Sequence, residues 1–310
     1  MQSRGDHDTP VTDATLLPDR LDPDSQRVRG DGVDLHVVTA GNPADPAVLL
    51  LHGFPDFWYG WREQIPALVD AGYRVVVPDQ RGYNLSDTPQ PVSAYRIGRL
   101  VADAASVIDW TGRESAHVVG HDWGAIVAWS LALRRPELVD RLGIINVPHP
   151  TVFRETLQSN PRQLLRSWYA VAMQLPRLPE WALARDDCAL LARTLAATAR
   201  PSAFSATDRR RYRAAWQAPG TVRGMVNWYR AAARHGVDTP RDRVREPTLV
   251  VWGQQDEALL PKMAQESVDY CADGRLERFP AASHWVHLEE PTAVSELLVD
   301  HLTTPTSAAD

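Results

Sequence analysis

The chain has 310 residues, of which 44% are hydrophobic and 23% are charged, and its formal net charge at pH 7 is −6. A globular chain of this length can bury one large core with an inserted part. The negative charge argues against a nucleic-acid surface, and the arginine-rich cluster at 209–213 is interpreted as a solvated helix face. No apolar run approaches the ~20 residues needed to cross a bilayer, so no membrane span is expected.

The termini and the cysteines indicate where the protein works. Residues 1–24 contain six aspartates and no apolar segment of the kind found in secretory signals. We therefore predict a disordered tail over 1–24, a second tail over 304–310, and a cytoplasmic protein. Cys188 and Cys271 lie far apart and lack the spacing of a zinc or redox site, so neither a metal site nor a disulfide framework is expected.

In chain order, the predicted elements begin with a hairpin and then alternate. Residues 27–29 and 33–39 flank the turn 30–32 and predict two antiparallel strands. Apolar runs predict buried strands at 47–51, 74–77, 116–119, 142–146, 247–252 and 275–279, and helical patterns fall at 61–70, 92–111, 257–268 and 291–302. Such strands, separated by helices, are typical of an α/β fold with a mostly parallel sheet covered on both sides.

The alternation stops after residue 147. From about 151 to 235 only helical patterns occur, interrupted by five prolines and enriched in Arg, Trp and Ala. We interpret residues 148–235 as an inserted all-helical cap, which divides one α/β core into the parts 25–147 and 236–303.

A strand, a sharp turn and a helix follow one another around Asp122. The strand 116–119 leads into a helical pattern with almost no loop, and Gly120 and Gly124 stand two residues on either side of Asp122. Small residues are needed there because the turn is tight. The stretch resembles the nucleophile elbow of the α/β-hydrolase superfamily, in the branch of epoxide hydrolases and haloalkane dehalogenases, where Asp replaces Ser. The alternative is an Asp that only caps the helix.

An aspartate nucleophile restricts the chemistry. Attack on an ester or amide carbonyl would give an anhydride, which is no easier a route, whereas attack on a saturated carbon gives a stable alkyl ester of the enzyme. The predicted substrate is therefore an alkylating agent, such as an epoxide or a haloalkane. The partial positive charge of the helix N-terminus favours the ionised form of Asp122.

Two further polar residues follow predicted strands. Asp256 comes after the strand 247–252 and His284 after 275–279, at the carboxyl ends where open α/β sheets hold their catalytic groups. Taken singly, each could be a structural residue, but the order Asp122, Asp256, His284 is the order of nucleophile, acid and histidine in α/β-hydrolases. His284 is predicted to activate water for hydrolysis of the ester, and Asp256 to orient the imidazole.

The resemblance implies the remaining catalytic groups. Backbone N–H groups of Phe54, in the motif His-Gly-Phe-Pro, and of Trp123 would form the oxyanion hole. Tyr169, which precedes Gln-X-Pro, and Tyr229, in Asn-Trp-Tyr-Arg, match the two lid tyrosines of epoxide hydrolases and would donate to the epoxide oxygen. Tyr212 fits neither lid motif.

Position 54 discriminates between the two reactions. Haloalkane dehalogenases commonly carry a polar or halide-contacting residue where this chain has Phe54, and fluoroacetate dehalogenases carry an arginine where it has Trp123. We therefore expect a cofactor-independent epoxide hydrolase that yields a vicinal diol; a haloalkane dehalogenase and a non-catalytic ligand-binding protein on the same scaffold are the alternatives.

The substrate is predicted to be a small epoxide, apolar or aromatic, because tryptophans cluster near the motifs. The residues predicted to contact it are Phe54, Pro55, Trp123, Trp168 and Trp285. We interpret the loop 79–87 as scaffold support, and His121 and His287 as structural.

Overall fold

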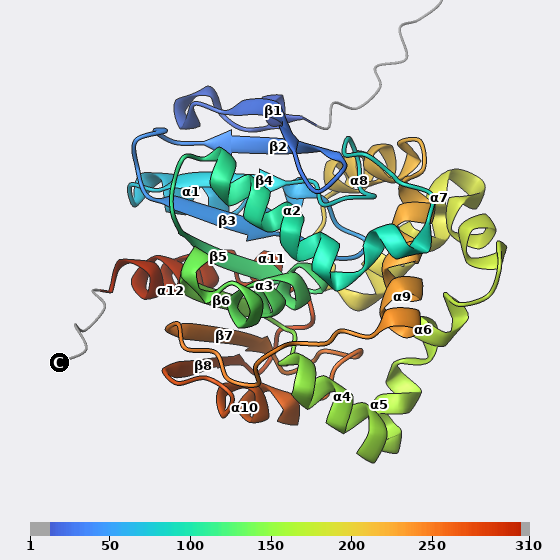
Figure 1. The fold of residues 1–310 in the computed structure, drawn as a ribbon. Helices are drawn as coiled ribbons and strands as arrows, with labels where there is room; N and C mark the ends of the chain where they lie inside the picture. The colour runs from blue at the N-terminus through green and yellow to red at the C-terminus, as the bar shows by residue number, and fades with distance from the viewer. Residues whose placement is uncertain (1–12, 305–310) are drawn as a thin grey trace, which may run out of the picture.

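The centre of the fold is an eight-stranded sheet, seen in the computed structural model, which describes residues 13–304 (Figure 1). The strand order is β1-β2-β4-β3-β5-β6-β7-β8, with β1 and β4 antiparallel to β2 and all other pairs parallel. The strands are β1 (Asp24–Arg29), β2 (Asp34–Ala40), β3 (Ala47–Leu51), β4 (Arg74–Pro78), β5 (Ala116–His121), β6 (Val139–Ile145), β7 (Thr248–Gly253) and β8 (Gly274–Phe279). The predicted α/β fold with a mostly parallel sheet is confirmed.

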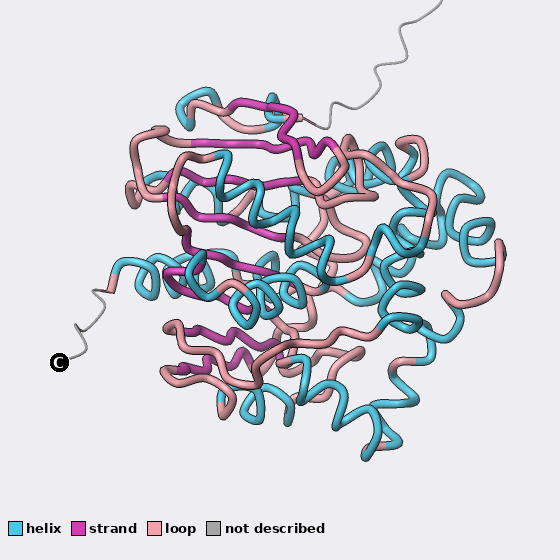
Figure 2. The backbone as a smooth tube through the Cα atoms, viewed as in Figure 1, coloured by secondary structure: helices cyan, strands magenta, loops and turns pink. Residues whose placement is uncertain are grey.

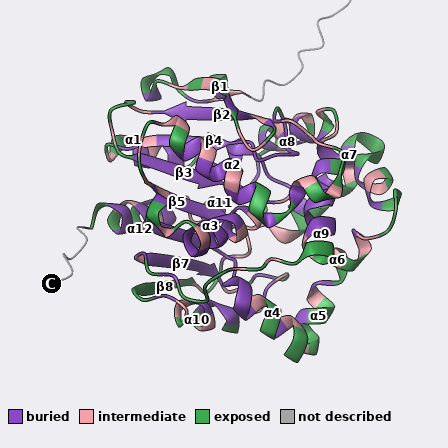
Figure 3. Cartoon of the chain, in the orientation of Figure 1, coloured by how far each residue is buried: buried purple, intermediate pink, exposed green. Residues whose placement is uncertain are grey.

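Burial follows the position of each strand in the sheet (Figure 3). Every residue of the inner strands β3 and β7 is buried, as expected where helices cover both faces. The edge strand β8 is instead polar and largely exposed, with Arg275, Glu277 and Arg278 along it. Charges of this kind protect an edge strand from pairing with other chains.

Helices cover the two faces of the sheet (Figure 1). On one face α2 (Ile97–Trp110) packs against α3 (Trp123–Arg134), and on the other α1 (Gln64–Asp70) packs against α12 (Pro291–Thr303). The shorter elements are α10 (Lys262–Val268), α11 (Val286–Glu289), η3 (Trp58–Trp61), η4 (Val92–Tyr95) and η5 (Pro136–Leu138). Among residues 13–304, no helix has both the length and the apolar character needed to cross a bilayer.

The helix predicted over 257–268 begins only at Lys262. The preceding loop is held differently, because the backbone N–H groups of Ala258 and Leu259 donate to the side chain of Asp256. This departure from the prediction has a functional cause, since the same loop fixes a predicted catalytic carboxylate.

Between β6 and β7 the chain forms helices and loops only (Figure 2). They are α4 (Pro150–Ser159), α5 (Pro161–Arg166), α6 (Trp168–Ala172), α7 (Leu178–Thr198), α8 (Ala206–Gln217) and α9 (Thr221–His235). The backbone of α7 leaves the helical conformation at residues 185–188, so this helix is kinked. We call residues 148–235 the cap.

The prediction of a disordered tail over residues 1–24 is wrong for residues 13–24. Two 3₁₀ turns, η1 (Ala14–Leu16) and η2 (Asp19–Leu21), precede β1, and Asp13 caps the first of them. Ala14, Leu17 and Leu21 are buried in the core. Asp13 therefore caps a turn, while the apolar residues that follow it pack inward. Residues 1–12 and 305–310, which complete the two predicted tails, lie outside the described residues.

Candidate active site

Asp122 stands at the apex of a strand–turn–helix elbow between β5 and α3. Its backbone has φ 49° and ψ −125°, a conformation that L-residues rarely adopt. A glycine at position 124 is required because a Cβ atom there would lie 2.0 Å from the carbonyl oxygen of Leu51. The strained turn projects the carboxylate beyond the carboxyl edge of the sheet, as the sequence pattern predicted.

The structure brings Asp122, His284 and Asp256 together from the ends of three strands. His284 Nδ1 lies 2.7 Å from Asp256 Oδ2, and His284 Nε2 lies 3.4 Å from Asp122 Oδ2. The imidazole is thus oriented by one carboxylate and faces the other. This is the geometry of a nucleophile, a base and the acid that orients it.

Asp256 is pinned from several directions. Its Oδ1 accepts hydrogen bonds from the Ala258 and Leu259 amides, and its Oδ2 accepts one from Asn146 Nδ2 at 2.8 Å. Asn146 Oδ1 in turn accepts from the Gly253 N–H at 2.7 Å. Sequence reasoning missed Asn146; its signal was a polar residue directly after the apolar strand β6, at the same sheet edge as the other site residues.

The charges of the triad shift the pKa values of all three groups. Burial by itself raises the pKa of Asp122, but the hydrogen bond and charge of His284 outweigh it and leave this pKa below its ordinary value. For Asp256 the same balance between burial and His284 also lowers the pKa. Burial opposes the charged imidazole, yet the charges of Asp256 and Asp122 raise the pKa of His284 to about 10. At neutral pH the free site therefore holds two carboxylates around an imidazolium.

One of the two amides predicted to form the oxyanion hole contacts Asp122 Oδ1. The backbone N–H of Phe54 donates to this oxygen at 2.6 Å. Gly53 permits the approach, because a Cβ atom there would lie 2.3 Å from the Cβ of Asp122. Trp123 is the first residue of α3, so its amide has no partner in the helix's own hydrogen-bond ladder.

Aromatic rings from the cap and from the core pack together next to Asp122. The Tyr229 ring makes edge contacts with Phe54, Trp123 and Tyr169, at centroid distances of 5.3, 5.1 and 5.9 Å. Tyr169 comes from α6 and Tyr229 from α9, so two cap helices meet residues of the core here. The two tyrosines taken from the resemblance thus stand together beside the nucleophile loop.

Both phenols are held in the protonated form. Burial, followed by the charge of Asp122, raises the pKa of Tyr169 and of Tyr229 above that of an ordinary phenol. A protonated phenol can donate a hydrogen bond to an oxygen that gains negative charge.

Three further residues predicted to contact the substrate differ in burial and in their partners. Trp168 is 68% exposed, which contradicts its prediction as a lining residue; α6 directs Tyr169 inward and Trp168 outward. Trp285 is buried, packs edge-on against His284 and donates to Thr198 Oγ1, so its contacts are those of a support for the imidazole. Pro55 is buried, and its carbonyl accepts a hydrogen bond from Trp216 of the cap.

The predicted scaffold role of the loop 79–87 agrees with the contacts of its first residue. Asp79 accepts hydrogen bonds from the Trp58 amide and the Asn84 side chain, and it contacts His36 Nδ1 at 2.6 Å. The next amide, of Gln80, donates to His52 Nε2 and so fixes the loop that carries Phe54.

A second buried polar group lies behind the triad. Tyr212, which fits neither lid motif, donates to Asp56 Oδ1 at 2.7 Å, and burial raises the pKa of Asp56 to about 7. Among residues 13–304, Asp56, His121 and His287 form the one group whose ligand atoms, within 4.8 Å of one another, could hold a metal. His121 Nε2 bonds to the His284 carbonyl oxygen, a contact that agrees with the structural role predicted for His121.

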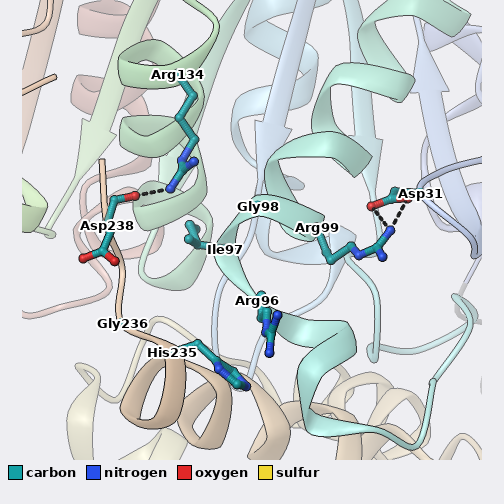
Figure 4. A pocket seen from close by; sticks show the side chains of 9 residues that line it. All are labelled: Asp31, Arg96, Ile97, Gly98, Arg99, Arg134, His235, Gly236 and Asp238. Carbon is teal, nitrogen blue, oxygen red and sulfur yellow. Dashed lines mark hydrogen bonds and ion pairs between the residues drawn. The ribbon is translucent and has the colours of Figure 1, made fainter. Parts of the chain in front are cut away.

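A surface pocket elsewhere contains none of the predicted site residues (Figure 4). It lies between the start of α2, the end of α3 and the end of α9. Within it Arg99 forms an ion pair with Asp31, and Arg134 donates to the Asp238 carbonyl. Two of its basic groups, Arg99 and Arg134, are thus engaged within the protein itself, and because the pocket holds none of the predicted catalytic residues we do not assign the reaction to it.

Comparison with known proteins agrees with this geometry. The family described as "alpha/beta hydrolase fold" matches residues 46–291. A Bacillus subtilis relative, AB hydrolase superfamily protein YfhM, is 43% identical over 277 residues, which cover 89% of this chain and 97% of that protein. Epoxide hydrolase A of Mycobacterium tuberculosis is 32% identical, with 91% of this chain and 98% of that protein covered.

Solved structures point the same way. The crystal structure of Bacillus megaterium epoxide hydrolase in complex with an inhibitor superposes with a TM-score of 0.83 at 30% identity, covering 90% of this chain and 100% of that one. Epoxide hydrolase A from Mycobacterium thermoresistibile gives a TM-score of 0.81 at 31% identity, covering 90% and 98%. The chain therefore belongs to the epoxide hydrolase family of the α/β-hydrolase superfamily.

Proposed function

We propose that this protein converts an epoxide and water into a vicinal diol through an alkyl ester on Asp122. The observation that carries the proposal is the position of His284, 2.7 Å from Asp256 and 3.4 Å from Asp122, in a site whose opposite wall holds two protonated phenols. A carboxylate, a base and two proton donors are the groups that ring opening and ester hydrolysis require.

In the first step the two oxygens of Asp122 have different roles. Oδ1 is held by the Phe54 amide, so Oδ2 attacks the epoxide carbon and the carbon–oxygen bond of the ring breaks. The released oxygen would be a strongly basic alkoxide, and it takes a proton from Tyr169 or Tyr229. The product is an ester in which Oδ1 is the carbonyl oxygen.

In the second step His284 acts as the base. Alkylation removes the charge of Asp122, which is one of the two carboxylate charges that raise the pKa of His284, so the imidazolium loses its proton more readily. Neutral His284 takes a proton from water, and the water oxygen attacks the carbonyl carbon of the ester, which is the side-chain carboxyl carbon of Asp122. The negative charge then falls on Oδ1, where the amides of Phe54 and Trp123 stabilise it.

Collapse of this intermediate breaks the bond between the ester carbon and Oδ2, and the expelled diol oxygen takes the proton back from His284, while the water oxygen stays in Asp122. The proton that the imidazolium lost after alkylation restores the tyrosinate to the phenol, and the new carboxylic acid of Asp122 returns its proton to His284.

The proposal includes the kind of epoxide that binds and the compartment in which the protein works. Rings of Phe54, Trp123 and the two tyrosines line the approach to Asp122, which favours an apolar or aromatic substituent on the epoxide. Cys188 and Cys271 are both buried and unpaired, which fits a reducing compartment such as the cytoplasm. Detoxification of reactive epoxides is the role we propose there.

The test combines turnover with trapping. The wild-type protein should convert styrene oxide into its diol, and His284→Gln should accumulate a covalent adduct that intact-mass spectrometry detects at one per chain. In solvent enriched in oxygen-18, the label should enter Asp122 over many turnovers of the wild type. Release of bromide from a bromoalkane without diol formation from any epoxide would assign the dehalogenase reaction instead.

A further inference from the structure

Apolar side chains gather on the outer surface of the cap. Eight of the nine large hydrophobic side chains that are exposed among residues 13–304 lie between positions 164 and 190, and the ninth is Leu85 in the core. Seven of them follow one another over α5, α6 and the start of α7, and we call these the cap patch: Leu164, Leu165, Trp168, Val171, Leu175, Leu178 and Trp181. Figure 3 shows exposed ribbon along these helices.

The exposed apolar side chains of the cap are concentrated in one segment of the chain. Leu164 of α5 and Trp168 and Val171 of α6 are each more than half exposed. On the inner side of the same segment, Gln163 is fully buried and donates to the Ala258 carbonyl. A concentration of exposed large apolar side chains of this kind marks an interaction site.

The charges beside the cap patch identify the partner. Residues 160–194 contain five arginines and three acidic residues, a net charge of +2, whereas the rest of the chain carries −8. Within residues 13–304, Glu180 is paired with Arg230 and Asp186 with Arg185. Four exposed side chains of the segment form no ion pair with any described residue, and they are three arginines and one aspartate: Arg162, Arg177, Arg193 and Asp187. The free charge around the patch is therefore positive.

We propose that the cap patch docks on an anionic lipid surface. Tryptophan and leucine side chains enter the boundary between headgroups and acyl chains, and arginines beside them bind anionic headgroups. A two-fold dimer through the same surface is less favourable, because it would bring the unpaired arginines of both copies together. The docking does not depend on the reaction proposed above, although that reaction gives it a use, since apolar epoxides concentrate in lipid.

The first test measures binding to sucrose-loaded vesicles by sedimentation. The wild type should bind vesicles of phosphatidylcholine with phosphatidylglycerol, bind pure phosphatidylcholine much more weakly, and be released by salt. The triple variant Leu165→Gln, Val171→Gln, Trp181→Gln should lose binding by roughly tenfold or more, because three apolar groups no longer enter the lipid. Leu85→Gln, the matched change on the core, should bind as the wild type does.

The second test separates charge from apolar contact. Arg162→Gln with Arg177→Gln should weaken binding to the anionic vesicles by roughly twenty-fivefold, from about fivefold per arginine. Arg20→Gln with Arg29→Gln, which changes the net charge equally outside the cap, should have little effect. Circular dichroism and diol formation from an epoxide dissolved in water confirm that every variant is folded.

Three results would overturn the proposal. The wild type could fail to bind anionic vesicles, or the triple variant could bind them as well as the wild type. Sedimentation velocity could also show a dimer that the triple variant loses while no vesicle binding occurs, which would assign the patch to a second copy of the chain. Each of these outcomes is independent of whether the protein forms a diol.

Discussion

The carboxylates of the site and its tyrosines are held in place by different forces. Asp256 accepts four hydrogen bonds, from Asn146, His284 and the amides of Ala258 and Leu259, and it lies at the end of a strand. Tyr169 and Tyr229 instead come from cap helices and are placed by ring contacts with one another and with the core. Hydrogen bonds thus hold the charged Asp256 in place, whereas ring contacts position the two phenols that are proposed to donate protons.

This difference assigns the two halves of the reaction to two parts of the chain. In the proposed mechanism the core supplies the groups that form and hydrolyse the ester, and the cap supplies the groups that stabilise the departing oxygen. A change in the core should therefore stop turnover, whereas a change in the cap should slow ring opening and leave ester hydrolysis nearly intact.

The largest effect should follow removal of the nucleophile. Asp122→Asn keeps the shape and the hydrogen bond to Phe54 but loses the attacking oxygen, so kcat/KM should fall by roughly 10⁴-fold or more. Diol formation measured by chromatography tests this, with intact mass confirming that the introduced amide has not hydrolysed back to a carboxylate. Activity within tenfold of the wild type would refute a covalent role for Asp122.

The next effect concerns the phenols of the cap. Tyr169→Phe and Tyr229→Phe should each slow alkylation by roughly 10²-fold, because one donor to the departing oxygen is lost, and the double variant should be slower than either. Single-turnover kinetics with rapid quenching separates alkylation from hydrolysis. Tyr95→Phe is the matched control, since its hydroxyl donates to the Pro89 carbonyl outside the site. If the double variant alkylates at the wild-type rate, the cap does not supply the acid.

The sequence correctly predicted that residues at the ends of several strands lie together. The elbow, Asp256 and His284 each follow a predicted strand, and strand order alone brings such ends together. The sequence-based predictions failed where the direction in which a side chain points decides whether it lines the site. Neighbouring helix residues point ~100° apart, so Trp168 faces solvent although Tyr169 faces the site.

Contacts between segments that lie far apart in the chain also could not be predicted from the sequence. Tyr212 and Asp56 are 156 residues apart, and nothing in either local pattern indicates that they share a hydrogen bond. The error at residues 13–24 has a simpler cause: composition counts six aspartates but does not show that Ala14, Leu17 and Leu21 pack together on the core. The two lid tyrosines were found by resemblance alone.

The pH dependence should differ between the two steps. The pKa of Asp122 is lowered and the pKa values of the two phenols are raised, so alkylation should be nearly flat from about pH 6 to about pH 9. Ester hydrolysis needs neutral His284, so its rate should rise with pH until the imidazolium of the ester form has lost its proton. Single-turnover rates across this range test both statements. A hydrolysis rate that fell with rising pH would exclude His284 as the base.

The smallest predicted effect is that of changing Asn146, a residue that touches no reacting atom. It is the most specific test of how the core holds its carboxylates. Asn146 has φ 50°, which glycine adopts without strain, so Asn146→Gly removes the side chain and leaves the backbone in place. Asp256 then loses one charge-assisted hydrogen bond, and ester hydrolysis should slow by roughly tenfold.

Alkylation should change little in the same variant, because Asp122 and the phenols keep their contacts. The ratio of the two single-turnover rates is therefore the decisive measurement: a merely structural role for Asn146 would lower both rates together, whereas a positioning role lowers the hydrolysis rate alone. Asn146→Ala should slow hydrolysis at least as much and also lower the melting temperature, since alanine is strained at this φ. A difference between the two variants confined to stability would place the kinetic effect in the lost hydrogen bonds of the Asn146 side chain, to Asp256 and to the Gly253 N–H, and not in the backbone conformation at position 146.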